Sequence, residues 1–266
     1  MKKWIKTLAA IITPVSLGIS ALAPVTSAQA AEKVKLGLVG DDTRVWDNVK
    51  ERLAKDGIEL EYVKFTEYSQ PNAALADGSI DLNAFQHQIF LDSYLQEHKD
   101  QELVSIGNTV NAPLGVYSKK IKDIKDLKEG DTVAIPSDPT NGGRALRLLQ
   151  TAGLIKVDEA KGYKPTVSDI KENKLNLKIQ ELDASQTARA LDDVTASIIN
   201  SGVAVDAGYT PSKDAIYLEP VDKSSKPYVN IIVARKKDAE NATYKKVIEE
   251  VSKGSLLPAW ETFGTK

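Results

Sequence analysis

The sequence predicts an α/β fold that is divided into two lobes with a ligand cleft between them. The first observation is that short apolar stretches alternate with stretches of helical spacing in two successive series. The second is size, since 266 residues with 42% hydrophobic content can build two small cores. Small-ligand sites form preferentially between such lobes.

The first series predicts a parallel sheet with helices between its strands. Its expected elements are a strand at 33–39, a helix at 43–56, a strand at 58–65, a helix at 71–76 and a strand at 80–84. Gly57 follows the first helix and Gly78 lies two residues beyond the second, where glycine commonly ends a helix. A further helix at 89–97 and a strand at 103–106 follow, and 114–117 is expected to leave this lobe as a strand.

The second series predicts the other lobe. Its expected elements are a strand at 132–135, a helix at 142–152, a strand at 177–182, a helix at 185–193 and a strand at 196–199. A strand at 228–234 and an amphipathic helix at 243–251 are expected after this series. The predicted boundaries are residues 31–115 plus 230–266 for the first lobe and 116–229 for the second.

The N-terminus has the pattern of a secretory signal peptide over residues 1–30. Three lysines precede an apolar run at 8–25, and Ser27-Ala-Gln-Ala30 supplies the small residues of a cleavage site after Ala30. Pro14 and Pro24 interrupt the run, which argues against a retained membrane anchor. We expect an exported protein, either periplasmic or at the cell surface or secreted.

The composition limits the kinds of partner and cofactor that we expect for this protein. The formal net charge is −2, removal of the three leader lysines makes it more negative, and no basic block stands out, so nucleic acid is not an expected partner. The absence of cysteine excludes disulfides, thiolate metal sites and a cysteine nucleophile. We expect a monomer without metal or other cofactor.

The residue types argue against an enzyme. His87 and His98 are the two histidines, and neither a G-x-S-x-G nucleophile motif nor an H-E-x-x-H zinc motif is present. The adjacent acidic pairs lie near expected helix ends, where capping or solvation explains them.

The stretch from 133 to 150 has the pattern of an anion site. A short strand is followed by a loop with two prolines and then by a helix, for which Thr140 or Asn141 could serve as the cap. Gly142 and Gly143 would let a ligand approach the backbone, and Arg144 offers a planar fork for a carboxylate. The same residues would also suit an ordinary capped turn with a solvated arginine.

Several segments together resemble the NlpA/MetQ family, the methionine-binding proteins of ABC importers. They include D-L-N-A-F-Q-H-Q at 81–88 and A-I-P-S-D-P-T-N-G-G-R-A-L at 134–146. The other segments are 65–75, 114–120, 153–155, 198–200, 214–216 and 228–232. They occur in matching order along nearly the whole chain after residue 30. The resemblance implies a periplasmic-binding-protein-like fold whose lobes close on methionine by movement about 114–117 and 228–232.

The resemblance also implies roles for individual residues. Arg144 would bind the carboxylate of L-methionine or a close analogue, helped by the helix start at Asn141, Gly142 and Gly143. Asn200 and Asn230 would hold the amino and carboxylate groups. The side-chain pocket would be lined by Tyr68, Phe85 and His87, because aromatic rings make favourable contacts with a thioether. An ABC-importer permease is the implied partner.

Two alternatives to methionine transport follow from the same sequence. One is a receptor for another small amino acid or a methionine-containing dipeptide, and the other is a surface adhesin that keeps the fold. Family members usually carry a lipid on a cysteine after the signal peptide, whereas this chain has Ala30-Ala-Glu32 there. This departure predicts a released protein, or one held at the surface by other means.

Overall fold

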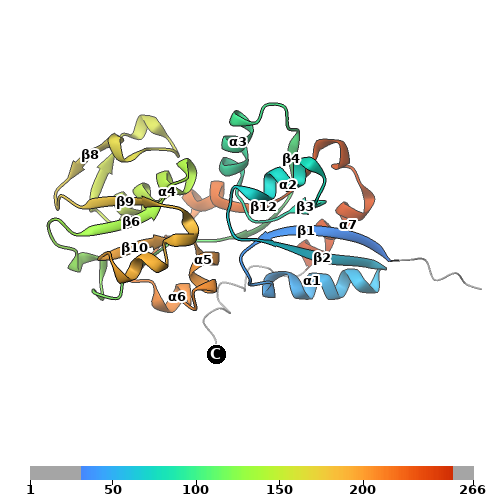
Figure 1. Ribbon diagram of the computed structural model, residues 1–266, viewed down its shortest axis with the longest axis horizontal. Coiled ribbons are helices and arrows are strands. Elements are labelled where there is room, and N and C mark those ends of the chain that lie inside the picture. The colour runs from blue at the N-terminus through green and yellow to red at the C-terminus, as the bar shows by residue number, and fades with distance from the viewer. Residues whose placement is uncertain (1–30, 254–266) are drawn as a thin grey trace, which may run out of the picture. The chain divides into compact units, whose positions relative to one another are not determined.

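The structure is a computed structural model that describes residues 31–253. The predicted signal peptide and the end of the predicted first lobe, 254–266, lie outside the described residues. Residues 31–253 contain two five-stranded sheets and one two-stranded sheet (Figure 1). No helix within 31–253 is both long enough and apolar enough to cross a membrane.

The first sheet has the strand order β2-β1-β3-β12-β4. Its strands are β1 (Glu32–Val39), β2 (Ile58–Phe65), β3 (Leu82–Asn83), β4 (Leu103–Asn111) and β12 (Val229–Arg235). β1 runs parallel to β2 and β3, while β12 is antiparallel to β3 and β4. The helices of this lobe are α1 (Arg44–Lys55), α2 (Gln70–Asp77), α3 (Gln88–Glu97) and α7 (Ala242–Lys253). The predicted parallel strand–helix series is confirmed.

Helical spacing explains how α1 covers the first sheet. Trp46, Val49 and Leu53 are three and four residues apart, so they share one face, and all three are buried against β1 and β2 residues such as Leu36 and Leu60. α7 adds Val247 and Val251 to the same core. A second apolar cluster lies under α2 and α3. The first lobe therefore has a core of its own.

The second sheet has the strand order β11-β5-β10-β6-β9. Its strands are β5 (Gly115–Tyr117), β6 (Thr132–Pro136), β9 (Lys178–Leu182), β10 (Ala196–Ile199) and β11 (Tyr217–Leu218), and β7 (Ile155–Val157) pairs separately with β8 (Ile170–Asn173). β6 runs parallel to β9 and β10, and β5 is antiparallel to β10. The helices are α4 (Pro139–Thr151), α5 (Ser201–Asp206) and α6 (Pro211–Asp214). Leu146 and Leu149 of α4 pack with Val133 and Ile135 of β6 in a second core.

Short 3-10 segments make up much of the remaining chain. They are η1 (Ile124–Asp126), η2 (Glu159–Lys161), η3 (Val167–Asp169), η4 (Ala184–Gln186), η5 (Arg189–Asp192), η6 (Lys223–Tyr228) and η7 (Lys236–Asp238).

The predicted helix at 185–193 is wrong, because this stretch forms η4 and η5 instead. The Thr187 carbonyl accepts a hydrogen bond from the Ser197 hydroxyl at 2.8 Å, and the Thr187 hydroxyl donates to the Ala184 carbonyl at 2.7 Å. An α-helix joins each amide to the carbonyl four residues earlier, whereas the amides of Thr187 and Asp193 bond to carbonyls three residues earlier, at 3.2 and 2.9 Å. The bond from Ser197 ties this segment to β10 of the second sheet.

The chain passes between the two sheets twice. The first passage joins β4 to β5 through residues 112–114, and the second joins β11 to β12 through residues 219–228. The stretch 114–117 was expected to leave the first lobe, and its strand β5 pairs in the second sheet. Below, lobe 1 denotes the elements around the first sheet and lobe 2 those around the second.

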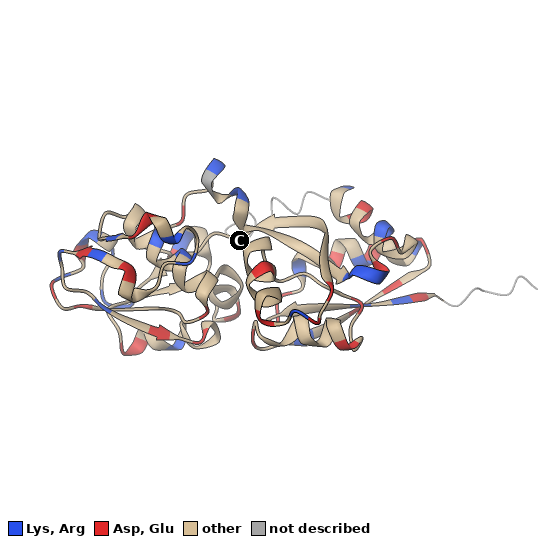
Figure 2. Ribbon diagram, turned by 90° about the horizontal axis from the view of Figure 1, so that it is seen from above, with Lys and Arg blue, Asp and Glu red and all other residues tan. Residues whose placement is uncertain are grey.

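Direct contacts also join the two lobes. The backbone amide of Asp41, in the turn between β1 and α1, donates to the carboxylate of Asp206 at the end of α5 at 3.1 Å. The ammonium group of Lys164 donates to the side-chain carbonyl of Gln96 at 3.2 Å. Figure 2 shows acidic and basic residues interspersed along both lobes. Exposed ion pairs such as Lys33–Glu61 contribute little to folding stability, so the apolar cores hold each lobe together.

Candidate ligand-binding site

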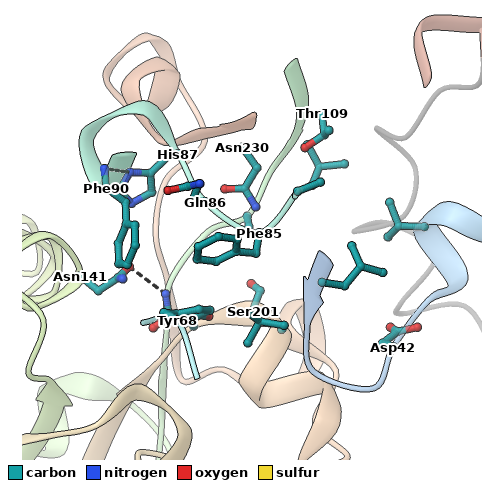
Figure 3. Close-up of a pocket in the computed structure, with 18 of the residues that line it drawn as sticks. Asp42, Tyr68, Phe85, Gln86, His87, Phe90, Thr109, Asn141, Ser201 and Asn230 are labelled. Atoms are coloured by element: carbon teal, nitrogen blue, oxygen red, sulfur yellow. Dashed lines mark hydrogen bonds between the residues drawn. The ribbon is translucent and has the colours of Figure 1, made fainter. Parts of the chain in front are cut away.

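A cavity of about 140 Å³ is lined by residues from both lobes (Figure 3). Lobe 1 contributes residues from β1, α1 and the segment between β3 and α3, and lobe 2 contributes the starts of α4 and α5. Seven of the nine predicted site residues line this cavity, namely Tyr68, Phe85, His87, Asn141, Arg144, Asn200 and Asn230. The fold therefore brings together residues that lie up to 162 positions apart in the sequence.

Three aromatic rings form one wall of the cavity. The rings of Tyr68 and Phe85 are stacked with centroids 5.9 Å apart. Figure 3 shows both rings among the cavity side chains. Phe90 on α3 meets Phe85 edge to face at 5.6 Å and Tyr68 at 6.2 Å. Contacts of this kind fix the rings relative to one another. The wall is therefore a preformed apolar surface.

A buried network of amides positions the segment that carries Phe85 and His87. The Asn72 side-chain oxygen accepts hydrogen bonds from Asn83 at 2.9 Å and Gln86 at 2.6 Å, and Asn72 donates to Gln86 at 2.9 Å. All three side chains are buried. Because buried amides are costly when unpaired, this network favours a single conformation for residues 83–87.

His87 is buried and electrically neutral. It caps α3, with its Nδ1 accepting a hydrogen bond from the Phe90 amide at 3.1 Å. Burial, with a further contribution from the charge of Arg144, lowers the pKa of His87 to about 3. Since Nδ1 acts as an acceptor, the ring proton belongs on Nε2, which is buried and has no hydrogen-bond partner among the described residues. His87 thus offers the cavity one uncharged donor.

Arg144 is buried at the junction of the two lobes and already has a carboxylate partner. Its Nε donates to Glu219 Oε1 at 2.9 Å, and its Nη2 donates to Glu219 Oε2 and, at 2.9 Å, to the Ala112 carbonyl. Its guanidinium carbon lies 4.1 Å from the centre of the Tyr228 ring. The two-point fork expected for a ligand therefore engages Glu219. Nη1 is the guanidinium nitrogen without a hydrogen bond to the rest of residues 31–253.

Asn200 presents a buried oxygen that has no partner in the described chain. Its side-chain Nδ2 donates to Asn141 Oδ1 at 2.9 Å, and Asn141 Nδ2 in turn donates to Asp138 Oδ2 at 2.9 Å. Although Asn200 is the N-cap residue of α5, its side chain accepts no hydrogen bond from the helix amides. Its Oδ1 is therefore available as an acceptor.

Asn230 lies on β12 opposite His87, with which it forms an isolated antiparallel bridge. Figure 3 shows its amide among the cavity side chains, near Gln86 and Phe85. Within residues 31–253 no side-chain hydrogen bond engages this amide, so it can act as donor or acceptor.

The expected helix start at Asn141–Gly143 requires correction. α4 begins at Pro139 and is capped by Asp138, whose Oδ1 accepts from the amides of Thr140 at 3.2 Å and Asn141 at 2.9 Å. Proline suits the first helical position and aspartate is a strong cap, so neither Thr140 nor Asn141 serves as the cap. The amides that were expected to face an anion are therefore occupied.

Gly142 and Gly143 lie inside α4 and do not line the cavity. A Cβ on Gly142 would come within 2.8 Å of the Pro136 carbonyl oxygen, and a Cβ on Gly143 would come within 2.6 Å of the Tyr163 carbonyl oxygen. The glycines therefore let the helix pack closely on neighbouring backbone. The sequence suggested that these two glycines allow close approach of a ligand. The structure shows instead that both face neighbouring backbone.

Sequence reasoning missed Phe90, Glu219, Tyr228 and Asp138. Phe90 could have been found, because it lies three residues after His87 on the same helical turn. Asp138 had the signal of an acidic residue directly before a proline at a helix start. Glu219 and Tyr228 lie far along the chain from Arg144 and carry no local signal. Among the described residues, no cluster of three His, Cys, Asp or Glu side chains could hold a metal ion.

Comparison with known proteins identifies the family. The sequence profile described as NlpA lipoprotein matches residues 34–256. The chain therefore belongs to the NlpA lipoprotein family. The D-methionine-binding lipoprotein MetQ of Escherichia coli strain K12 is 46% identical over 233 residues, which cover 85% of this chain and 83% of MetQ.

Solved structures of similar proteins have the same two-lobed fold. A nutrient-binding protein from Burkholderia cenocepacia bound to methionine has a TM-score of 0.79 at 43% identity, covering 84% of this chain and 93% of that protein. A periplasmic substrate-binding protein of an ABC transporter from Coxiella burnetii has a TM-score of 0.79 at 38% identity, covering 86% and 96%. The fold predicted for this member of the NlpA family is confirmed.

Proposed function

We propose that this protein is an extracytoplasmic binding protein that captures methionine and delivers it to an ABC importer. The observation that carries the proposal is one cavity whose lining combines two chemically different kinds of side chain. Aromatic rings form one wall of the cavity, and the lining also includes the buried Arg144 and the unpaired oxygen of Asn200. A free amino acid with an apolar side chain has the same division.

The aromatic wall suits a thioether. Tyr68, Phe85 and Phe90 pack against one another in this wall, and the uncharged His87 contacts Phe90 edge to face. Sulfur–aromatic contacts contribute about 0.3–1.5 kcal/mol each, and a neutral Nε2–H can donate weakly to the sulfur. A charged side chain would find no opposite charge on this wall. The side chain of methionine therefore fits this wall better than that of an acidic or basic amino acid.

The polar side chains of the cavity suit a zwitterion. Arg144 Nη1 would bind the ligand carboxylate, and the Asn200 oxygen would accept from the ammonium group, with Asn230 contributing its amide to either group. The Glu219 carboxylate balances the charge of Arg144, so the cavity has no large excess of positive charge. A ligand without net charge matches this balance better than an anion does.

Ligand capture would proceed by closure of the two lobes about residues 112–114 and 219–228. In this proposal lobe 1 holds the chain up to about residue 115 and again from about 230, and lobe 2 holds the middle. A ligand that touches both lobes favours the closed state, because only that state offers all of its contacts. The hydrogen bond between Asp41 and Asp206 supports this proposal, because it joins one lobe to the other.

The relatives support both the substrate class and the location. The similar proteins include a D-methionine-binding lipoprotein and a periplasmic substrate-binding protein of an ABC transporter. The signal-peptide pattern at residues 1–30 supports export. The family name refers to lipoproteins, whereas this sequence contains no cysteine. We propose a monomeric receptor without enzymatic activity, whose partner is an importer permease.

A thermal-shift measurement tests the function. The purified protein is unfolded and refolded to remove any co-purified ligand, and is then heated with each free amino acid in turn, with both enantiomers of methionine and with Gly-Met. Ligand at 100 times its dissociation constant adds about 2.7 kcal/mol to the free energy of unfolding. We expect a clear rise in Tm with methionine.

Each other outcome has a definite meaning. A rise with a different amino acid or only with Gly-Met would keep the receptor and change its substrate. No rise with any amino acid or dipeptide would contradict the proposed function and favour an adhesin that keeps the fold.

A further inference from the structure

A directional chain of hydrogen bonds leads from Asp138 through Asn141 to Asn200. The Asp138 carboxylate accepts four bonds, from the amide and hydroxyl of Thr140 and from the amide and side-chain Nδ2 of Asn141. Asn141 Oδ1 then accepts from Asn200 Nδ2 at 2.9 Å. Asn200 Oδ1 is buried at the end of the chain without a partner among residues 31–253.

We propose that Asp138 is a positioning residue that makes Asn200 present an oxygen, rather than an NH₂ group, to the ligand. This inference rests on the proposed methionine function and adds the residue that selects for the amino group. Asp138 does not line the cavity and would act through two amides.

The orientation of each side-chain amide is fixed by the preceding group in this chain of hydrogen bonds. A carboxylate offers only acceptors, so Asn141 must turn its Nδ2 toward Asp138 and its Oδ1 away. Asn200 must then turn its own Nδ2 toward that oxygen, which leaves its Oδ1 free. An isolated amide could flip and exchange oxygen for nitrogen, but this chain permits a single orientation.

The free oxygen discriminates between ligand groups. An ammonium group can donate to it, and hydrogen bonds that involve a charged group are stronger than neutral ones. A hydroxyl group can also donate, while a hydrogen atom in the same place leaves the oxygen buried and unpaired. Asn200 gives up its usual capping bond on α5, which is consistent with a ligand role for its oxygen.

The substitution Asp138→Asn separates this role from helix capping. Asparagine caps helices about as well as aspartate, so its Oδ1 would keep the bonds from the amides of Thr140 and Asn141. Its Nδ2 would replace the oxygen that faces Asn141. Two NH₂ groups cannot pair, so the amides of Asn141 and Asn200 would both flip, and Asn200 would present its NH₂ group to the ligand.

The experiment measures the affinity of wild type and D138N for three ligands by calorimetry. They are methionine, its analogue with hydroxyl in place of the amino group, and 4-(methylthio)butanoate, which lacks both. In wild type the hydroxyl donates to Asn200 Oδ1, and in D138N it can accept from Asn200 Nδ2. We expect D138N to weaken methionine binding about tenfold or more while changing the affinity of the hydroxy analogue by less than about threefold.

The outcomes separate this proposal from the proposed function. Suppose that wild type binds methionine, and that D138N either lowers the affinity for all three ligands by the same factor or leaves all three affinities unchanged. Asp138 then only caps the helix, and the inference is overturned. If wild type itself fails to bind methionine, the proposed function fails first. Urea unfolding of both ligand-free proteins provides the folding control, and equal midpoints are expected.

Discussion

Arg144 and Glu219 form a two-point ion pair across 75 positions of the sequence, with Arg144 Nε 2.9 Å from Glu219 Oε1. Both side chains are largely buried, and Tyr228 covers the guanidinium plane. Glu219 also accepts a hydrogen bond from the Leu114 amide at 3.0 Å, next to the first passage between the lobes. The pair thus joins the cavity to both segments about which the lobes would close.

The substitution Arg144→Ala should abolish methionine binding. It removes the nitrogen proposed for the ligand carboxylate and leaves Glu219 buried without its partner. The measurement is calorimetric titration with methionine. Arg147→Ala is the matched control, because Arg147 lies on the same helix, is partly exposed and does not line the cavity. Methionine affinity that is the same in R144A and wild type would remove Arg144 from the site.

The substitution Glu219→Gln should lower the free energy of unfolding of the ligand-free protein. It should also reduce the preference for methionine over the analogue that lacks the amino group. The neutral side chain keeps the shape but leaves the buried charge of Arg144 unbalanced, which costs about 3 kcal/mol in comparable buried pairs. A ligand carboxylate would then restore the balance, so 4-(methylthio)butanoate should gain affinity relative to methionine. Urea unfolding and competition binding measure the two effects. A lower stability with no change in relative affinity would separate Glu219 from ligand selection.

His87 should make stability depend on pH in the acidic range. Its pKa falls to about 3 in the folded protein because of burial, against about 6.5 in the unfolded chain. Below pH 6.5 the unfolded state therefore binds more protons than the folded state, and stability decreases as the pH falls toward 3. Between these two pKa values the free energy of unfolding is expected to change by up to about 1.4 kcal/mol for each pH unit.

The check is urea unfolding of wild type and His87→Gln between pH 4 and 8. Their difference in free energy of unfolding should be constant above pH 7 and should shift in favour of the variant below pH 6. A difference that stays constant through the acidic range would show that His87 takes up protons equally in both states.

The substitution Gly143→Ala should destabilise the protein by about 1–3 kcal/mol. The new Cβ would lie 2.6 Å from the Tyr163 carbonyl oxygen and 2.8 Å from the Lys164 Cα, and backbone on both sides resists movement. Gly202→Ala on α5 is the control, because no heavy atom lies within 4 Å of its Cβ position and alanine favours a helix. Equal urea midpoints for G143A and wild type would contradict the close packing of α4.

Most elements could be predicted because their signals are local. The run of apolar residues in β2 and the helical spacing of Trp46, Val49 and Leu53 in α1 are properties of neighbouring residues. At 185–193 the chain forms two short 3-10 turns, and the Ser197 hydroxyl ties the Thr187 carbonyl to β10, a contact that helical spacing in the sequence does not reveal. The start of α4 was misplaced because the capping strength of Asp138 was overlooked in favour of the residues after the proline.

The sequence by itself determined the α/β class, the family resemblance and seven of the residues that line the cavity, because each depends on residue type and order. Only the tertiary structure decided that Glu219 occupies the fork of Arg144, that Gly142 and Gly143 face backbone, and that Asn200 Oδ1 has no partner. The physical reason is that charge pairing, hydrogen-bond direction and close packing depend on distances between residues far apart in the chain. Those distances are set when the two lobes fold and meet.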